Sequence, residues 1–230
     1  MGLKESGLRG SLRNVSVGIA AIPDTVVLRP ESDDLDNFEA INGSIGLWDI
    51  NNDTPVLDGN LSLKFVGSDS GAIASSPGEG LPYYPDVGDE VWVWVNIVNN
   101  NTFAFSSIFH GGAERLFNDG LSVVLSGRES EYQIQASGDI KVSESQTYSE
   151  GQWYLIRYDT DSDDNDLLVQ IRLHDGPTID DPIIQDHSLT LQDSDLIGQR
   201  GIAFEEPGDN DEFAVDKLVA GEGSGNPDMS

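Results

Sequence analysis

Short apolar runs with a period of two, divided by glycine and proline, limit what this chain can fold into. Helical periodicity is nearly absent along its length. The 25 glycines and 10 prolines punctuate the runs, and side chains that alternate at every second position are typical of β-strands. Sandwich domains often reach roughly 200–250 residues, so this chain of 230 residues fits one such domain with appendages. The pattern predicts an all-β, antiparallel sandwich.

The runs that fit strands are spread along the whole chain. They are residues 15–20, 38–40, 47–50, 61–66, 73–75, 90–98, 104–110, 121–126, 132–136, 153–159, 167–174, 200–205 and 213–220. In residues 91–97 (VWVWVNI) both alternating faces are apolar, which predicts a central strand covered on both sides.

The acidic residues 159–166 (DTDSDDND) predict the solvated tip of a hairpin between two of these strands. An EF-hand calcium loop that started at Asp159 would need glycine at its sixth position and glutamate at its twelfth. Those positions hold Asp164 and Gln170, so we prefer the hairpin.

Charge is unevenly distributed along the chain. The 41 acidic and 12 basic residues give a formal net charge of −29. Residues 1–30 contribute +4 − 2 = +2, so the other 200 residues sum to −31. The Debye length falls from ~10 Å at about 0.1 M salt to ~3 Å at about 1 M, so concentrated salt screens this self-repulsion. The composition indicates a halophile, with an acidic mesophilic surface protein or a disordered acidic chain as the alternatives.

Composition also argues against several classes of protein. The chain has no cysteine, which excludes disulfides and thiolate metal sites. No apolar run approaches the ~18 residues of a membrane span, and the run at residues 17–22 is too short for a secretory signal. We therefore expect no membrane insertion and no signal-directed export. Nucleic acid is a poor partner, because phosphate binding requires clustered lysine and arginine.

These patterns divide the chain into three regions. We expect an extended N-terminal attachment arm at residues 1–32, a sandwich at residues 33–220 and a flexible, glycine-rich tail at residues 221–230. The arm combines positive charge with apolar side chains that could pack on a partner. Its candidate contact residues are Arg9, Arg13, Val15, Val17 and Ile19.

Several segments together resemble the concanavalin A-like lectin/glucanase superfamily. In order, they are residues 38–39, 58–63, 90–97, 105–109, 119–125, 151–154 and 213–219. The Gly-x-Trp-Tyr at residues 151–154 and the closing run FAVDKLV at residues 213–219 recur in that superfamily. The resemblance covers roughly residues 36–220 and implies a jelly-roll sandwich like that of laminin-G-like modules and legume lectins.

Glycosidases of this superfamily carry paired acids on one strand, as Glu-x-Asp-x-x-Glu. Retaining hydrolysis needs two carboxyl groups ~5–5.5 Å apart, and residues i and i+2 of a strand share a face. The two candidate strands, residues 91–96 and 105–110, hold no carboxylates at such spacing. We therefore expect a protein that is not an enzyme.

The resemblance also implies a structural Ca²⁺ between the first and last strands. The matching ligands are Glu39, the carbonyl of Gly59 and Asp216. Ca²⁺ takes six to eight oxygen ligands from carboxylates and backbone carbonyls. The alternative is that both acids are ordinary solvated residues.

A sugar site is expected on the loop that follows the strand at residues 104–110, since such loops shape sugar sites in lectins. Its candidate residues are His110, Arg115 and Asp119. The aromatic ring that would stack on the sugar is Trp92, Trp94 or Trp153, with Trp94 as the chosen candidate, and the alternative is that all three belong to the core.

One hypothesis combines these features: a non-enzymatic jelly-roll module mounted on a larger assembly by its arm. A neutral-to-basic arm avoids like-charge repulsion from acidic partners and can order on docking. The alternative is that the arm is an N-terminal strand that packs on its own domain. By analogy, the chain resembles a fibre, spike or turret protein on the virion surface of a tailed virus of haloarchaea, assembled in the host cytoplasm. Its partners would be other virion proteins, further copies of itself, and a host glycan or surface glycoprotein.

Three alternatives stay open. The protein could be a capsid or tail decoration that binds no sugar, or a cellular haloarchaeal carbohydrate-binding surface protein. A glycoside hydrolase is the third, against which the missing acid pair argues.

Overall fold

The computed structural model describes residues 25–28, 38–42, 46–49, 56–57, 61–66, 70–73, 89–99, 103–108, 120–163, 166–192, 202–205 and 212–222. Within these ranges the chain forms fifteen β-strands, β1 to β15, and no helix. None of the described segments could therefore cross a membrane as a long apolar helix. The expected contact residues of the arm and the expected strand at residues 15–20 lie outside these ranges.

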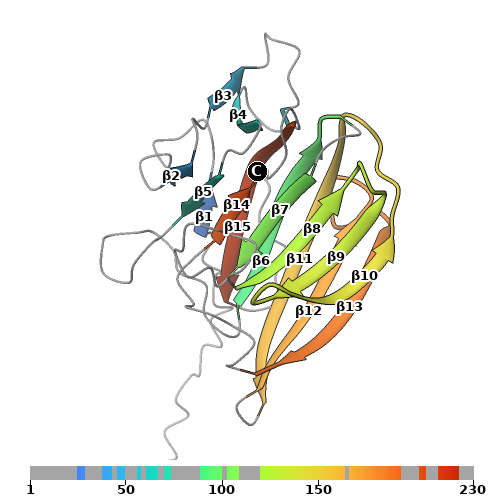
Figure 1. Ribbon diagram of the computed structural model, residues 1–230. Coiled ribbons are helices and arrows are strands. Elements are labelled where there is room, and N and C mark those ends of the chain that lie inside the picture. Colours follow the sequence, from blue (N-terminus) through green and yellow to red (C-terminus); the bar gives the residue numbers. More distant parts are fainter. Residues whose placement is uncertain are drawn as a thin grey trace, which may run out of the picture.

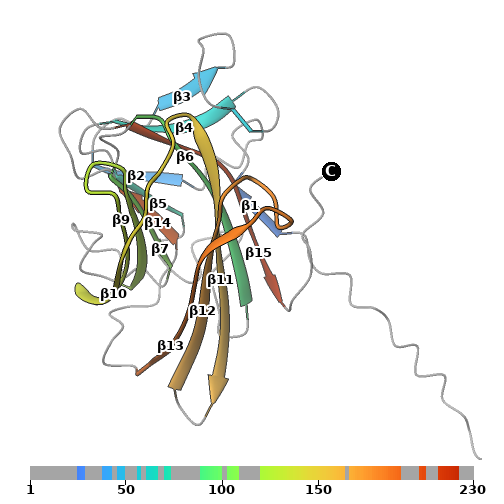
Figure 2. The ribbon, with the colours of Figure 1, turned by 90° about the vertical axis from the view of Figure 1, so that its right-hand side faces the viewer.

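The strands form two antiparallel sheets that pack as layers (Figure 1). Sheet A consists, in spatial order, of β13 (Ile183–Leu191), β12 (Asp166–His174), β11 (Gln152–Asp163), β6 (Asp89–Ile97), β15 (Glu212–Glu222), β4 (Leu61–Val66) and β3 (Gly46–Asp49), with β1 (Thr25–Leu28) paired to β15. Sheet B consists of β10 (Asp139–Ser145), β9 (Glu131–Ala136), β8 (Leu121–Ser126), β7 (Phe103–Ile108), β14 (Ile202–Glu205), β5 (Ser70–Ile73) and β2 (Phe38–Asn42). Figure 2 shows the two layers from the side. The predicted all-β, antiparallel jelly-roll class is confirmed.

Strand β6 occupies the middle of sheet A. It pairs with β11 on one side and with β15 on the other. The side chains of residues 90–97 are all buried, on both faces of the strand. The double coverage predicted from the run VWVWVNI is confirmed.

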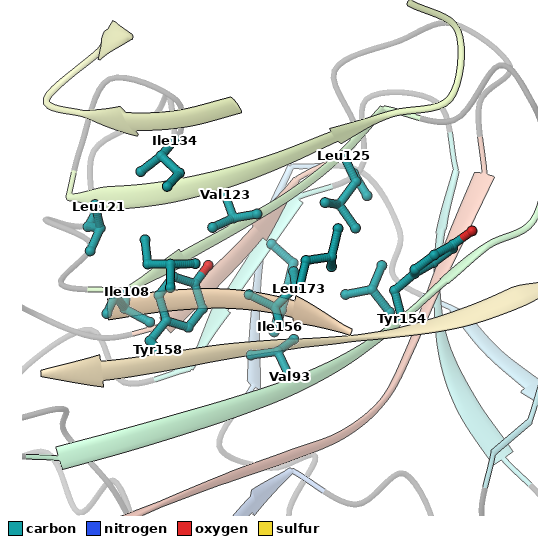
Figure 3. Packing of buried hydrophobic residues seen from close by; sticks show 14 of the residues in the cluster. Val93, Ile108, Leu121, Val123, Leu125, Ile134, Tyr154, Ile156, Tyr158 and Leu173 are labelled. Atoms are coloured by element: carbon teal, nitrogen blue, oxygen red, sulfur yellow. The ribbon is translucent and has the colours of Figure 1, made fainter. Parts of the chain in front are cut away.

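The main core lies between the two sheets (Figure 3). Val93 of β6 and Ile156 of β11 face Val123 and Leu125 of β8 across this space. Burying a side chain of this size contributes about 1.5–3 kcal/mol. Strand β9 shows how the sequence specifies this packing. Its side chains alternate between partly exposed and buried along the whole strand, so one face of the strand meets the core.

A tyrosine joins the two sheets by a buried hydrogen bond. The hydroxyl of Tyr158 on β11 donates to the carbonyl oxygen of Ser106 on β7 at 2.8 Å, and lies 3.2 Å from the Ser106 hydroxyl. Burial raises the pKa of Tyr158 above its usual 10.0, although the hydrogen bond to Ser106 opposes this. Tyr132 on β9 is also fully buried, but its hydroxyl has no hydrogen-bond partner among the described residues.

Three strands were not predicted from the sequence: β1, β10 and β13. Strands β10 and β13 are the outer edges of the two sheets, and their largely polar, exposed side chains hide the apolar period. Strand β1 lies inside the expected arm and pairs with β15. Strand β15 extends to Glu222, two residues past the expected end of the sandwich.

The two tyrosines give a matched test of the core. We predict that Tyr158→Phe lowers the free energy of unfolding by about 1–2 kcal/mol, because the Ser106 carbonyl loses its donor. Tyr132→Phe removes a hydroxyl that is buried without a partner, so it should leave stability unchanged or raise it. Urea unfolding in molar KCl measures both. Equal losses in the two variants would contradict the proposed bridge between the sheets.

Candidate functional site

The outer face of sheet A, which is turned away from sheet B, carries two rows of polar and aromatic side chains. Alternate residues of a strand share a face, so the register of the strands defines each row. The first row holds Trp92, Arg157, Arg172 and Asp186, and the second holds Glu90, Asp159, Gln170 and Ser188. Four adjacent strands, β6, β11, β12 and β13, therefore contribute to one continuous surface.

One end of this face is covered by protein. Trp92, Trp94 and Leu155 form a second buried cluster, separate from the main core. The connection between β12 and β13 crosses this cluster, and the indole Nε1 of Trp94 donates to the carbonyl of Pro177 at 2.5 Å. In Figure 2 the connection, in orange, lies on the side of sheet A away from β9 and β10. Solvent is therefore excluded from this end of the face.

Asp181 holds the covering connection in one shape. Its Oδ2 accepts hydrogen bonds from the backbone N–H and the hydroxyl of Thr178, both at 2.7 Å. Gly176 has a φ of +154°, and a Cβ at that position would lie 2.4 Å from the same carboxylate oxygen. Glycine is needed there for both reasons.

His174 ends β12 beneath this connection and is buried. Its Nδ1 lies 3.2 Å from the carbonyl oxygen of Asp181 and donates to it, while Nε2 is buried and finds no partner in the described part of the chain. Burial lowers the pKa of His174 below its usual 6.5, and the charges of Arg157 and Arg172 lower it further. The hydrogen bond to the Asp181 backbone and the charge of the Asp181 carboxylate oppose that shift without reversing it. The imidazole is therefore neutral at neutral pH.

Arg157 lies in the middle of the outer face and is held from two sides. Its guanidinium forms an ion pair with Glu90, and the two side chains are 13% and 4% exposed. The same guanidinium lies 5.1 Å from the centre of the Trp92 ring, within the range of a cation–π interaction.

Arg172 is the neighbour of Arg157 on β12 and has its own partners. Its Nε lies 3.6 Å from Oδ1 of Asp186, and its Nη2 donates to Oε1 of Gln170 at 2.5 Å. The Nε2 of Gln170 in turn donates to Oδ1 of Asp186 at 3.1 Å. Two like charges in register would repel each other, and the acids paired with them offset this repulsion.

Next to Gln170 the outer face opens into a hollow of about 350 Å³, which we call the β11–β13 hollow. The residues that line it are Asp159, Asp161, Leu168, Val169, Gln170, Ser188, Leu189 and Thr190. Val169 and Leu189 turn their side chains toward the main core, so they contribute backbone to this face. Leu168, in register with Asp161 and Thr190, supplies the apolar side chain at the hollow. The hollow thus offers carboxylates, an amide and hydroxyls beside one apolar side chain.

The acidic stretch that lines the hollow was predicted to be a hairpin tip. The hairpin is confirmed, but β11 continues to Asp163, which pairs with Asp166. Asp159 and Asp161 are therefore strand residues on one face rather than turn residues. Their spacing of two was the signal in the sequence, and it was obscured because an aspartate-rich run is typical of a turn.

The structure describes only part of the predicted sugar site. His110, Arg115 and Asp119 lie outside the described residues. Trp94 is fully buried beneath the β12–β13 connection. Its ring therefore offers no open face to a sugar, as in the alternative that places it in the core.

The structure also describes only part of the predicted calcium site. Gly59 and the side chain of Glu39 lie outside the described residues, and Glu39 and Asp216 belong to strands of different sheets. Asp216 is buried, and its Oδ2 accepts a hydrogen bond from the backbone N–H of Leu57 at 2.5 Å. No cluster of three or more histidine, aspartate or glutamate side chains that could hold a metal occurs among the described residues. One carboxylate is far short of the six to eight oxygens that Ca²⁺ takes, so the described residues do not fit the ion by themselves.

Comparison with known proteins supports the fold. No protein-family model and no curated protein sequence matches this chain. The exoplasmic/lumenal domain of VIP36 in its Ca²⁺/Man3GlcNAc-bound form is 11% identical, with a TM-score of 0.53 over 87% of this chain and 89% of that one. Peanut lectin with a nine-residue peptide is 10% identical, with a TM-score of 0.52 over 84% and 94%. Lectin II from Ulex europaeus is 9% identical, with a TM-score of 0.51 over 86% and 95%.

These similarities establish a shared architecture. At such low identity they show the fold of a lectin-like sandwich, in agreement with the concanavalin A-like resemblance of the sequence. The site has to be argued from the residues of this chain.

Because of His174, we predict that the stability of the fold depends on pH. A histidine whose pKa is lowered by folding stabilises the fold fully above its unfolded pKa, near 6.5. Below that pH the unfolded chain takes up a proton that the folded chain refuses, so stability falls until the folded pKa is reached. His174→Asn keeps a donor for the Asp181 carbonyl but does not titrate. We predict that it reduces the fall in melting temperature between neutral and mildly acid pH. If the melting temperature falls by the same amount in both proteins across that range, His174 is not the cause of the pH dependence.

Proposed function

We propose that this protein is a carbohydrate-binding module that uses the β11–β13 hollow and does not cleave its ligand. The observation that carries this proposal is the hollow in the outer face of sheet A. Its opening is lined by hydrogen-bonding side chains from three adjacent strands. A rigid sheet is a suitable platform, because its side chains do not have to become ordered on binding.

The chemistry of the lining suits a sugar. Carboxylates such as Asp159 and Asp161 accept hydrogen bonds from ligand hydroxyls, and bonds to charged acceptors are about twice as strong as neutral ones. The amide of Gln170 and the hydroxyls of Ser188 and Thr190 add donors and acceptors. The side chain of Leu168 can contact the C–H groups of a sugar ring.

Two solved structures with this fold support the proposal by what they contain. The VIP36 domain is bound to Man3GlcNAc, and a lectin named UEA-II, with a TM-score of 0.51 and 8% identity, is complexed with galactose. Both are lectin-like sandwiches that bind sugars. The present chain shares the fold, and its hollow supplies the polar groups.

The arrangement of the acids on the outer face also favours binding over hydrolysis. Glu90 lies opposite Asp159 on neighbouring strands, a cross-strand pair that sequence spacing along one strand does not reveal. A glycosidase needs one carboxyl group kept protonated as the general acid. Glu90 is buried and paired with Arg157, so its carboxylate is engaged within the protein. Glu90 is thus suited to a structural ion pair.

Replacing the two aspartates should separate binding from folding. We predict that Asp159→Ala with Asp161→Ala weakens binding to a polysaccharide at least about tenfold, because each lost charged hydrogen bond is worth about 1.5–3 kcal/mol. Affinity electrophoresis through gels that contain soluble polysaccharides measures the loss. The control is Asp139→Ala with Glu144→Ala, which removes the same charge from the exposed strand β10 of sheet B.

Two outcomes of that experiment would contradict the proposal. Equal binding by both double variants would place the sugar elsewhere, and reducing ends released from the polysaccharide would make the protein an enzyme. A calcium ion at Glu39, Gly59 and Asp216 remains a prediction. The same gels run with EDTA and with CaCl₂ test whether binding needs the ion.

The setting that we propose for this module is the surface of a virion that infects haloarchaea. The distribution of charge supports it, since an acidic body of −31 follows a segment of +2 at residues 1–30. Acidic partners would repel the body and accept the segment. Other virion proteins would hold the segment, several copies would assemble, and weak contacts to a host glycan would add up through avidity.

Removing the segment before β1 tests this setting. We predict that a chain lacking residues 1–24 keeps the sandwich and binds polysaccharide, because β1 and its pairing with β15 are retained. It should fail to join purified native particles in a sedimentation assay, whereas the full chain joins them. If the shortened chain sediments with the particles as the full chain does, the attachment role of the segment is wrong.

A further inference from the structure

Resting on the proposed function of the β11–β13 hollow, we propose that the hollow selects uncharged glycans and rejects glycans that carry carboxylate groups. The distinction is set by charge rather than by shape. It follows from which charged groups line the hollow and from how the nearby arginines are engaged.

The lining itself is negative. Asp159 and Asp161 contribute two carboxylates, and none of the eight lining residues is lysine or arginine. An anionic ligand group within a few ångströms of these carboxylates is repelled, and the repulsion is several times stronger near a protein surface than in bulk water. An uncharged sugar meets the same carboxylates as hydrogen-bond acceptors.

The two arginines described on this face do not cancel the negative charge of the hollow, because each is paired with an acid. Arg157 is committed to Glu90, and Arg172 faces Asp186 at 3.6 Å. The two arginines and two partner acids sum to zero. With the two lining aspartates, the charge of this part of the outer face is 2 − 4 = −2.

Arg172 also contributes to the hollow in another way. It binds Oε1 of Gln170 while Asp186 accepts from Nε2 of the same amide, so the amide is fixed from both sides. Nε2 carries two N–H groups, and the one that is not bonded to Asp186 gives the hollow a neutral donor. The arginine therefore orients a neutral group instead of meeting an anion directly.

A matched set of ligands tests the inference. Soluble neutral polysaccharides, among them mannan, laminarin and galactan, are run beside alginate and polygalacturonate in affinity gels with the full chain. The neutral polymer that binds best is then oxidised at its primary hydroxyls to carboxylates, and part of that product is converted to the methyl ester. We expect the oxidised polymer to bind at least about tenfold more weakly and the methyl ester to recover most of the affinity, because esterification removes only the charge.

A matched variant checks that the aspartates cause the discrimination. Asp159→Asn with Asp161→Asn keeps the size of both side chains and removes the two charges. We expect this variant to lose most of the difference between the oxidised polymer and its ester. Raising the KCl concentration should shrink the difference in the unmodified protein as well, because salt screens charges at an exposed site.

The outcomes separate the inference from the function beneath it. If an acidic polymer binds as tightly as its neutral or esterified form, or if only acidic polymers bind, the selection for uncharged glycans is wrong and the module stands. If no polysaccharide binds, the proposed function fails and the inference fails with it. If the Asn variant discriminates as strongly as the unmodified protein, the aspartates are not the cause.

Discussion

Burial of strand β6 on both faces is the constraint on which the rest of the molecule depends. Its odd-numbered residues fill the space between the sheets, and its even-numbered residues include two tryptophans that must also be kept from water. A two-layer sandwich covers only one face of each sheet. The outer face of sheet A therefore needs further cover at β6, and the connection between β12 and β13 supplies it.

This requirement explains why the outer face of sheet A is dry at one end and open at the other. The connection covers the tryptophans and His174, and it is held in shape by Asp181 and Gly176. The next row, with Asp159, Gln170 and Ser188, is polar and does not require such cover. The hollow lies at this boundary, where β11 to β13 present carboxylates, an amide and hydroxyls to solvent.

Much of the fold could be predicted from the sequence, and the part that could not has a common cause. Strands with clear apolar runs, such as β4 and β8, were predicted to the residue. Strands β10 and β13 were missed because an edge strand has few buried side chains to show a period. The end of β11 was missed because Asp159 to Asp163 have the composition of a turn, although pairing with β12 keeps them in the sheet. Half of the residues that line the candidate site, Asp161, Ser188, Leu189 and Thr190, lie on these missed segments, and for that reason the sequence pointed to other residues.

The sequence by itself determined the all-β class, the doubly covered central strand, the strongly acidic body and the near-neutral beginning of the chain. These properties depend on the period and charge of neighbouring residues, which a linear chain displays directly. Only the tertiary structure decided that Arg157 is held by Glu90, that Trp94 lies beneath a connection, and that two aspartates meet Ser188 and Thr190 around one hollow. The first and third of these relations join neighbouring strands through register, and the second brings a connection over the face of the sheet. Register is set by how whole faces pack against each other, and a local stretch of sequence does not contain it.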